Sequence, residues 1–475
     1  MVVQHNMQAM NANRMLNITT GAQSKSTEKL SSGYRINRAA DDAAGLTISE
    51  KMRKQIRGLD QASTNAQDGV SSVQTAEGAL TEVHSMLQRM NELAVQASNG
   101  TNADSDRQAI QDEIDQLTTE IDRVAETTKF NEIYLLKGDN SSTKNVYMNG
   151  HDAGLKGTLT DGAKKATFTM DTLEAGDKVT IAGKEYTIGS TKTDAEALLD
   201  KADAAATAAG AGNSVDVEID GTKYTITFKA GGNTIADAAG NTVADLKALK
   251  DKVAAGSKVS YDGNSLTVMN DGNGAVAADG VDDDDSSIIT KTVAEQKIVA
   301  ELTAANNVGT VEEKASVTND GDANGKTTYT INKGYATVAD TLSFNLHVGA
   351  DADMTNKITV DIDTMNSANL GIKGLNVTDA TGTAATYAVD AISDAIAKVS
   401  SQRSALGAVQ NRLEHTIDNL DNIVENTTTA ESRIRDTDMA EEMVNYSKNN
   451  ILAQAGQSML AQANQSNQGV LSLLQ

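Results

Sequence analysis

Residues 73–94 read VQTAEGALTEVHSMLQRMNELA. Apolar residues recur here in alternating steps of three and four, at Val73, Ala76, Leu80, Val83, Leu87, Met90 and Ala94. This spacing puts them on one face of an α-helix, which must be buried against another helix. Near the other end, a step of seven recurs at Ile392, Val399, Leu406, Leu413 and Leu420, as in paired helices. The two ends are therefore predicted to come together as one helical rod.

Turn residues divide the terminal regions into several expected helices. A first helix precedes a loop around Gly33, a second begins near Asp41 or Asp42, and the run 99–102 (Asn-Gly-Thr-Asn) ends it. A third helix is expected through 110–124, followed by a short β-like run at 130–136. The seven-residue stripe predicts a helix from about 387 to 426, roughly 60 Å long. The last 40 residues are also expected to be helical.

The middle, roughly 156–338, has a different character. Gly, Ala, Asp, Thr and Asn dominate it, and apolar residues alternate with period two around Asp220-Gly221, which indicates a β-hairpin. Three stretches resemble one another, at 178–188, 216–226 and 258–268. Ala-rich helical stretches follow the first two, near 194–209 and 242–254. We therefore expect ββα units in one or two small domains, and strands again at 342–348 and 358–362.

The composition of the 475 residues narrows the possible classes of protein. There is no Cys, Pro or Trp, so disulfides and thiol chemistry are excluded and long helices are uninterrupted. The net charge of −24 disfavours nucleic acid and anionic membrane surfaces as partners. The N-terminus lacks the pattern of a cleaved signal peptide, and no stretch is apolar enough to insert in a membrane.

No catalytic or metal-binding constellation is evident, so no cofactor is expected. The five His are scattered, without a His-Glu-x-x-His pair. The run 320–325 (Asp-Gly-Asp-Ala-Asn-Gly) looks like the start of a calcium loop, but Ile331 takes the place of the bidentate Glu, so a solvated turn is expected. The acidic run 282–285 is likewise expected to be a solvated loop. We therefore expect no enzyme.

Five separated segments resemble conserved segments of one protein family, the bacterial flagellins. They are KLSSGYRIN (29–37) with AADDAAGL (39–46), LQRMNELAVQ (87–96), SQRSALGAVQNRL (401–413), ESRIRDTDMA (431–440) and the ending VLSLL (470–474). The resemblance covers about 1–140 and 340–475. It implies a structural subunit that polymerises into the flagellar filament for swimming motility, and that is exported to the outside without a cleaved signal peptide.

The resemblance also implies an architecture, which agrees with the helical pattern. We expect an α+β fold: a long antiparallel coiled-coil rod formed by both termini, with a β-rich, ββα-like variable middle inserted between them. Residues 1–43 and 435–475 would form the inner helical core. Residues 44–155 and 339–434 would form a paired-helix rod with β-hairpins, and 156–338 the outer domain or domains.

The same resemblance implies partners and contact residues. The chain would bind copies of itself, a flagellar export chaperone, and the filament cap and hook-junction proteins. Host Toll-like receptor 5 would contact Arg89, Glu113 and an exposed Leu93, although these residues could instead serve filament packing. Leu471, Leu473 and Leu474 would serve polymerisation, chaperone binding and recognition by cytosolic innate sensors.

Two other functions stay open at this point. A hook–filament junction protein shares the terminal motifs but would form a single ring. A surface adhesin would use the repeated middle as its binding region. Deletion of the middle separates the two classes, since a filament subunit should still polymerise and an adhesin should lose its function.

Overall fold

The computed structural model describes residues 6–210, 212–229, 233–272, 279–309, 312–379 and 381–473. The chain divides into two compact units. Residues 1–74, 344–360 and 406–475 form unit 1, and residues 75–343 and 361–405 form unit 2. Two long helices, α2 (Ala43–Ala97) and α8 (Thr383–Arg435), contribute to both units.

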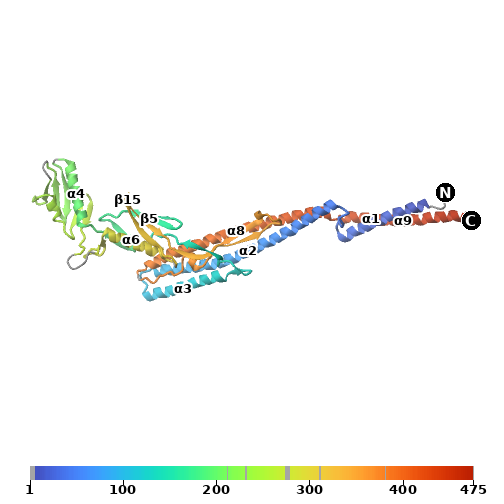
Figure 1. Ribbon diagram of the computed structural model, residues 1–475, viewed down its shortest axis with the longest axis horizontal. Helices are drawn as coiled ribbons and strands as arrows, with labels where there is room; N and C mark the ends of the chain where they lie inside the picture. Colours follow the sequence, from blue (N-terminus) through green and yellow to red (C-terminus); the bar gives the residue numbers. More distant parts are fainter. Residues whose placement is uncertain are drawn as a thin grey trace. The chain divides into compact units, whose positions relative to one another are not determined.

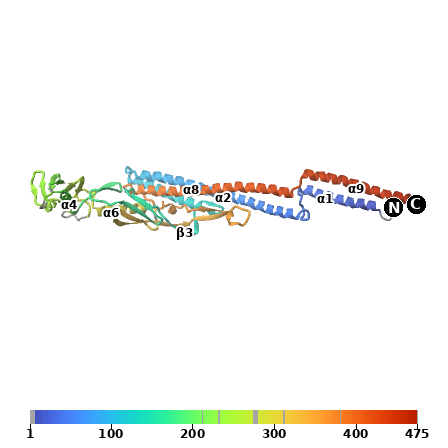
Figure 2. The ribbon, with the colours of Figure 1, turned by 90° about the horizontal axis from the view of Figure 1, so that it is seen from above.

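In unit 1, the first helix packs along the last one. Helix α1 (Met7–Ser32) and helix α9 (Met439–Leu473) lie side by side and antiparallel, with the two chain ends adjacent (Figures 1 and 2). Asn6 Nδ2 donates to the carbonyl of Ala463 (3.1 Å), and Lys29 Nζ pairs with Glu442 (3.5 Å) at the other end. The expected meeting of the two termini is therefore confirmed within this unit.

The seven-residue stripe forms the buried seam of α8. Leu413 and Leu420 pack on Ala66, Ala62 and Leu59 of α2 in unit 1. In unit 2, Ile392 and Val399 are fully buried, and Arg403 pairs with Glu77 of α2 at 3.6 Å. As the residue number rises on α2 it falls on α8, so the helices pair antiparallel in each unit.

The predicted breaks between the terminal helices are confirmed. Gly33 ends α1 in the left-handed conformation (φ 75°), which glycine adopts without steric cost, and its N–H caps the carbonyl of Lys29. Helix α3 (Asp104–Thr127) follows the expected break, and the hairpin of β1 and β2 follows α3. The Gln111 side chain on α3 bonds the carbonyl of Leu375 and the N–H of Val377 (both 2.8 Å), which holds that segment.

The middle contains several small sheets and two separate hydrophobic cores. One core lies between α6 and a four-stranded sheet of order β15-β16-β5-β4, around Phe168 and Tyr329. The other lies between α4 and a six-stranded sheet of order β11-β10-β9-β8-β12-β13, around Leu199 and Ile226. The strands are β1 Lys129–Phe130, β2 Ile133–Tyr134, β3 Asp139–Tyr147, β4 Thr158–Asp161, β5 Lys165–Asp171, β6 Lys178–Ile181, β7 Lys184–Ile188, β8 Ser214–Ile219, β9 Thr222–Thr227, β10 Thr234–Asp237, β11 Thr242–Val243, β12 Lys258–Tyr261, β13 Asn264–Thr267, β14 Ile288–Ile289, β15 Ser316–Ala323, β16 Lys326–Asn332, β17 Tyr335–Asp340, β18 Leu342–His347 and β19 Lys357–Ile362. The remaining helices are α4 Lys192–Ala209, α5 Leu246–Lys250, α6 Lys291–Asn306, α7 Ser367–Leu370 and the 3-10 turn Met354–Asn356.

The three similar stretches are three similar hairpins. Each turns on two residues with positive φ, at 182–183, 220–221 and 262–263, as a two-residue hairpin of this hand requires. Helix α4 follows the first hairpin as predicted. The helix predicted at 242–254 is wrong over most of its length. Thr242–Val243 instead pairs with β10, and Asp245 caps a helix of only five residues, α5.

These elements confirm the predicted fold class. Terminal helices flank a strand-rich middle, and the fold is α+β.

Candidate protein-binding surfaces

Arg89 lies at the centre of an exposed ion-pair cluster between α2 and α3. Its Nε donates to Glu113 on α3 (2.9 Å), and its NH1 pairs with Glu92 one turn along α2 (3.2 Å). These carboxylates, Glu113 first, raise the pKa of the Arg89 guanidinium. All three side chains are between 43% and 68% exposed, so the pairs add little to stability but present fixed charges to a partner.

Leu93 does not belong to this exposed cluster. Its side chain is 2% exposed and lies on the buried face of α2, with Met90 and Ala97. The expectation of an exposed Leu93 is therefore wrong. The reason is its spacing, since Leu93 follows the buried Met90 by three residues and so shares its helix face. The stripe in the sequence already contained this information.

Val95 is the apolar side chain that the sequence reading missed. It is 53% exposed and follows Glu92 by three residues, on the same face as the ion-pair cluster. The arrangement is thus one exposed apolar side chain, a helical turn beyond an arginine that pairs with two carboxylates. Such mixed surfaces suit recognition by another protein.

The α1–α9 pair leaves many large apolar side chains uncovered. On α1 these are Met7, Met10, Met15 and Ile18, and on α9 they are Met439, Met443, Val444, Ile451, Leu452 and Met459. Met443 to Leu452 line a groove of about 580 Å³ on α9, and a second groove of about 690 Å³ runs between the two helices past Met15 and Met459. Apolar surface this extensive marks a protein contact.

The C-terminal leucines fall at the edge of what is described. The backbone of Leu471 and Leu473 belongs to α9. Their side chains, and the whole of Leu474, lie outside the described residues.

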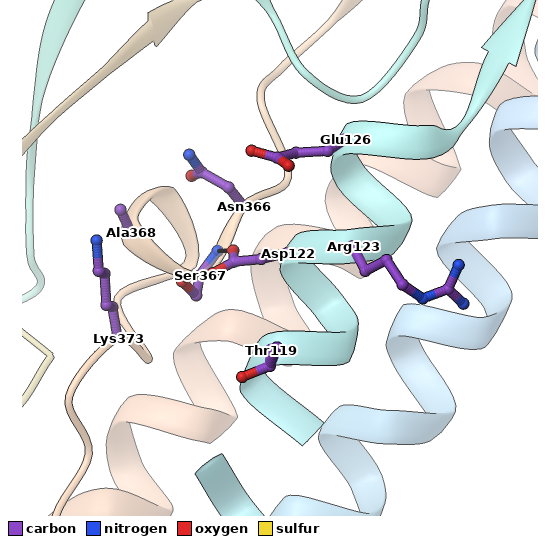
Figure 3. A pocket seen from close by; sticks show the side chains of 8 residues that line it. All are labelled: Thr119, Asp122, Arg123, Glu126, Asn366, Ser367, Ala368 and Lys373. Atoms are coloured by element: carbon purple, nitrogen blue, oxygen red, sulfur yellow. Dashed lines mark hydrogen bonds between the residues drawn. The ribbon is translucent and has the colours of Figure 1, made fainter. Parts of the chain in front are cut away.

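A polar groove of about 360 Å³ lies between the last turns of α3 and the short helix α7 (Figure 3). Asp122 accepts from the N–H (2.7 Å) and the hydroxyl (2.8 Å) of Ser367, which fixes α7 against α3. Arg123 points away from the groove and pairs with Glu120. Thr119, Glu126 and Lys373 also line the groove.

The acidic segments of the middle are engaged within the chain. Asp322, in the hairpin of β15 and β16, pairs with Lys291, and Asp320 accepts from Thr330. Asp282 is 7% exposed and accepts hydrogen bonds from three backbone N–H groups, those of Asn270, Asp284 and Asp285, which hold the loop together. The expectation that the run is solvated is therefore wrong for Asp282.

Nowhere in the described residues do three His, Cys, Asp or Glu side chains gather closely enough to hold a metal ion. None of the described helices combines the length and the apolar character needed to cross a bilayer.

Two family models match the ends of the chain. The model of the bacterial flagellin N-terminal helical region matches residues 3–141, and that of the C-terminal helical region matches residues 389–474. The flagellin of Clostridium tyrobutyricum is 40% identical over 471 residues, 98% of this chain and 100% of that one. The flagellin of Halalkalibacterium halodurans is 34% identical over 474 residues, 100% of both chains.

Solved structures are more distant. The flagellar hook associated protein-3 of Legionella pneumophila is 13% identical, over 81% of this chain and 98% of that one, with a TM-score of 0.32. A similarity this low carries no argument.

Proposed function

The chain belongs to the bacterial flagellin family, and we propose that its copies form the extracellular filament that a flagellar motor turns for swimming. This family is a structural protein family and not an enzyme family, so the chain is a structural subunit of the flagellar filament. Its mechanism is mechanical. Identical subunits joined by non-closing contacts generate a helical filament.

The observation that carries this proposal is the uncovered apolar surface of the α1–α9 pair. Met7 is 70% exposed, Val444 67% and Ile451 66%, although each belongs to a packed helix pair. Exposed apolar surface on this scale is unfavourable in water and becomes favourable when a neighbour covers it. Further copies of the chain supply that neighbour, since the same helices recur in every subunit.

Seeded elongation followed by electron microscopy tests this proposal. Purified chain added to short filament fragments should extend them into long helical filaments. Ile451→Glu should prevent elongation, because a charge would be buried in the contact. The matched control is Met354→Glu, at a residue 72% exposed on the 3-10 turn, which should elongate normally.

The same experiment separates the two rival functions. Persistent short rings would favour a hook–filament junction protein. Monomers that never elongate, with retained binding to a surface by the middle, would favour an adhesin.

Recognition by Toll-like receptor 5 is a second part of the proposal. Arg89 and Glu113 would contact the receptor directly. The buried Leu93 would contribute indirectly, by keeping α2 in position. The exposed ion-pair cluster supports this, together with the resemblance of 87–96 to the family. Arg89→Ala and Glu113→Ala should each weaken binding to the purified receptor ectodomain about tenfold, or about 1.4 kcal/mol, more than most interface residues contribute. Arg123→Ala, in the neighbouring pair with Glu120, is the control that should leave affinity unchanged.

Further partners follow from the same family membership. The export chaperone, the cytosolic innate sensors and the polymer itself would engage the C-terminal end, through Leu471, Leu473 and Leu474. The filament cap and the hook-junction proteins would contact the ends of the growing filament. A truncated chain ending at Gly469 should lose both polymerisation and chaperone binding, and retention of both would contradict this part.

We also propose export without a cleaved signal peptide and the division into three domains. Residues 1–43 with 435–475 would form the inner core, 44–155 with 339–434 the rod, and 156–338 the outer part. Mass spectrometry of protein sheared from cells should find an uncleaved N-terminus. Limited proteolysis should cut near the three boundaries.

A further inference from the structure

One segment of α2 carries an unpaired row of positive charge. Lys51, Lys54 and Arg57 are exposed and follow one another at three-residue intervals, so they form a continuous basic ridge. None of the three has an ion-pair partner among the described residues, whereas their neighbour Arg53 pairs with Glu50 at 3.5 Å. In a chain of net charge −24, such a concentration of free cations is unusual.

Helix α3 carries the opposite charge. Within 104–127 there are eight acidic residues and two arginines: Asp104, Asp106, Asp112, Glu113, Asp115, Glu120, Asp122 and Glu126, against Arg107 and Arg123. Asp115, Asp122 and Glu126 recur at steps of seven and four, which places them along one side of the helix. We name these three residues the acidic face.

The acidic face borders a groove. Asp122 and Glu126 line the groove shown in Figure 3, next to Thr119. Arg123 also lines it, but its guanidinium pairs with Glu120. Within the part of the chain that the structure describes, no lysine or arginine lies within ion-pair distance of the acidic face. Lys373 lines the opposite side of the groove.

We propose that the basic ridge of one subunit docks on the acidic face of a second copy of the same chain. Lys51 to Arg57 spans about 9 Å along its helix and Asp115 to Glu126 about 16 Å, so the ridge fits within the length of the acidic face. The charges are complementary. Within the described residues neither surface forms an ion pair, although Asp122 accepts hydrogen bonds from Ser367 and Asp115 accepts one from Gln111.

This contact rests on the proposed polymerisation and specifies one interface within it. Each copy offers a ridge and accepts a ridge, so a head-to-tail contact of this kind can continue from copy to copy along a filament. Exposed ion pairs contribute little energy individually. Their effect falls on the rate and register of association, so elongation should slow as salt screens the charges.

Charge reversal followed by mixing tests the contact. Lys51→Glu with Lys54→Glu reverses the ridge, and Asp115→Lys with Glu126→Lys reverses the acidic face. Each variant alone should elongate seeds about ten times more slowly than the parent, the low end of electrostatic steering. An equal mixture of the two should recover the parent rate, because each reversed ridge then meets a reversed face on the other variant. Circular dichroism of the monomers checks that both variants fold.

A matched control carries the same change of charge elsewhere. Lys201→Glu with Lys258→Glu alters two exposed lysines of the middle that have no ion pair in the described residues. This variant should elongate at the parent rate. If it slows as much as the ridge variant, net charge alone is responsible and the inference is overturned.

Disulfide trapping supplies a second, independent readout. The chain has no Cys, so Lys54→Cys with Thr119→Cys introduces the only two thiols. Oxidised filaments of this double variant should give a ladder of covalent multimers on a non-reducing gel, and monomers should not. If the oxidised filaments give only the monomer band, the two thiols either do not meet or meet within one chain. Either result would overturn the inference. If the parent chain itself forms no filaments, the proposed function fails instead.

Discussion

Leu93 and Val95 are separated by one residue on α2, yet one is 2% exposed and the other 53%. Leu93→Ala removes buried side-chain volume, so we expect the free energy of unfolding to fall by about 2–5 kcal/mol. Val95→Ala removes exposed atoms and should change it by less than about 0.5 kcal/mol. Urea unfolding monitored by circular dichroism measures both.

This pair also changes how receptor binding must be tested. A loss of affinity in Leu93→Ala is informative only if the variant is still folded under the conditions of the assay. Equal stabilities for the two variants would contradict the buried position of Leu93.

Asp322 makes the middle sensitive to acid. Its contacts, the ion pair with Lys291 first and then the Thr327 hydroxyl, lower the pKa of its carboxyl. A carboxyl whose pKa is lowered on folding stabilises the folded state above its unfolded pKa, and this contribution is lost as pH falls through the folded pKa. The same contact raises the pKa of Lys291. The contribution of the protonated Lys291 to folded-state stability is therefore lost only at alkaline pH.

Asp322→Asn should therefore lower stability at pH 7, by less than about 1 kcal/mol because both side chains are over a third exposed. The difference from the parent should shrink as the pH falls below the ordinary carboxyl pKa of 3.8 and through the lower folded pKa. Hydrogen exchange in the hairpin of β15 and β16 measures it. Asp171→Asn, an exposed carboxylate without an ion pair in the described residues, is the comparison that should show no such trend.

At the scale of the element, two glycines inside α2 have different roles. A Cβ at Gly69 would lie 2.3 Å from Leu346 Cδ1 and 3.3 Å from Leu413 Cδ1, whereas one at Gly78 would meet nothing within 4 Å. Gly69 thus allows close approach of α2 to its neighbours, and Gly78 only weakens the helix.

Gly78→Ala should raise the free energy of unfolding by about 0.5–1 kcal/mol, the helix propensity gained. Gly69→Ala gains the same propensity but must displace Leu346, and overpacking costs about 1–3 kcal/mol. We expect a net loss of about 1 kcal/mol. Thermal unfolding of the two variants should move in opposite directions, and a shared direction would mean that the packing at Gly69 is loose.

An element can be predicted from the sequence where a local pattern of residues determines it. The long helices were predictable because their apolar spacing is sustained over many turns, as at Leu406, Leu413 and Leu420. Helix α5 was overestimated because the Ala-rich composition of 242–254 favours a helix, while pairing of Thr242–Val243 with β10 takes up part of the segment. These two strands are neighbours in sequence, but at four and two residues they are too short to show an alternating apolar pattern. The family resemblance predicts Arg89 and Glu113 as receptor contacts but not the ion pair between them, and Val95 is not predicted because it lies outside the apolar stripe.

At the scale of the whole molecule, the second core of the middle is a self-contained insertion. All buried residues around Leu199 and Ile226 lie within 195–268. The two ends of this segment are adjacent, because Ser190 N–H donates to Thr267 (3.3 Å) and Met269 N–H to Ser190 (3.0 Å). Joining Ser190 directly to Met269 therefore requires little rearrangement of the remaining chain.

A chain lacking 191–268 should fold and still elongate filament seeds. Calorimetry of the parent should contain a melting transition that is absent from this variant, since the removed core is separate. The control is a deletion that cuts through a core, such as 166–190, which removes β5 and should prevent folding of the middle. Failure of the 191–268 variant to elongate would mean that this part of the middle takes part in assembly.

Helix α1 packs against α9, the last helix to be synthesised. This pairing has a consequence for the time at which the chain can fold. A ribosome completes α1 and α2 long before α8 and α9 exist, so α1 lacks α9 and α2 lacks α8 during most of synthesis. Contacts between residues so far apart in the chain form late, because a long loop must close first. The newly made chain is therefore expected to stay open until its final residues emerge, and a delay in folding is encoded in the order of its helices.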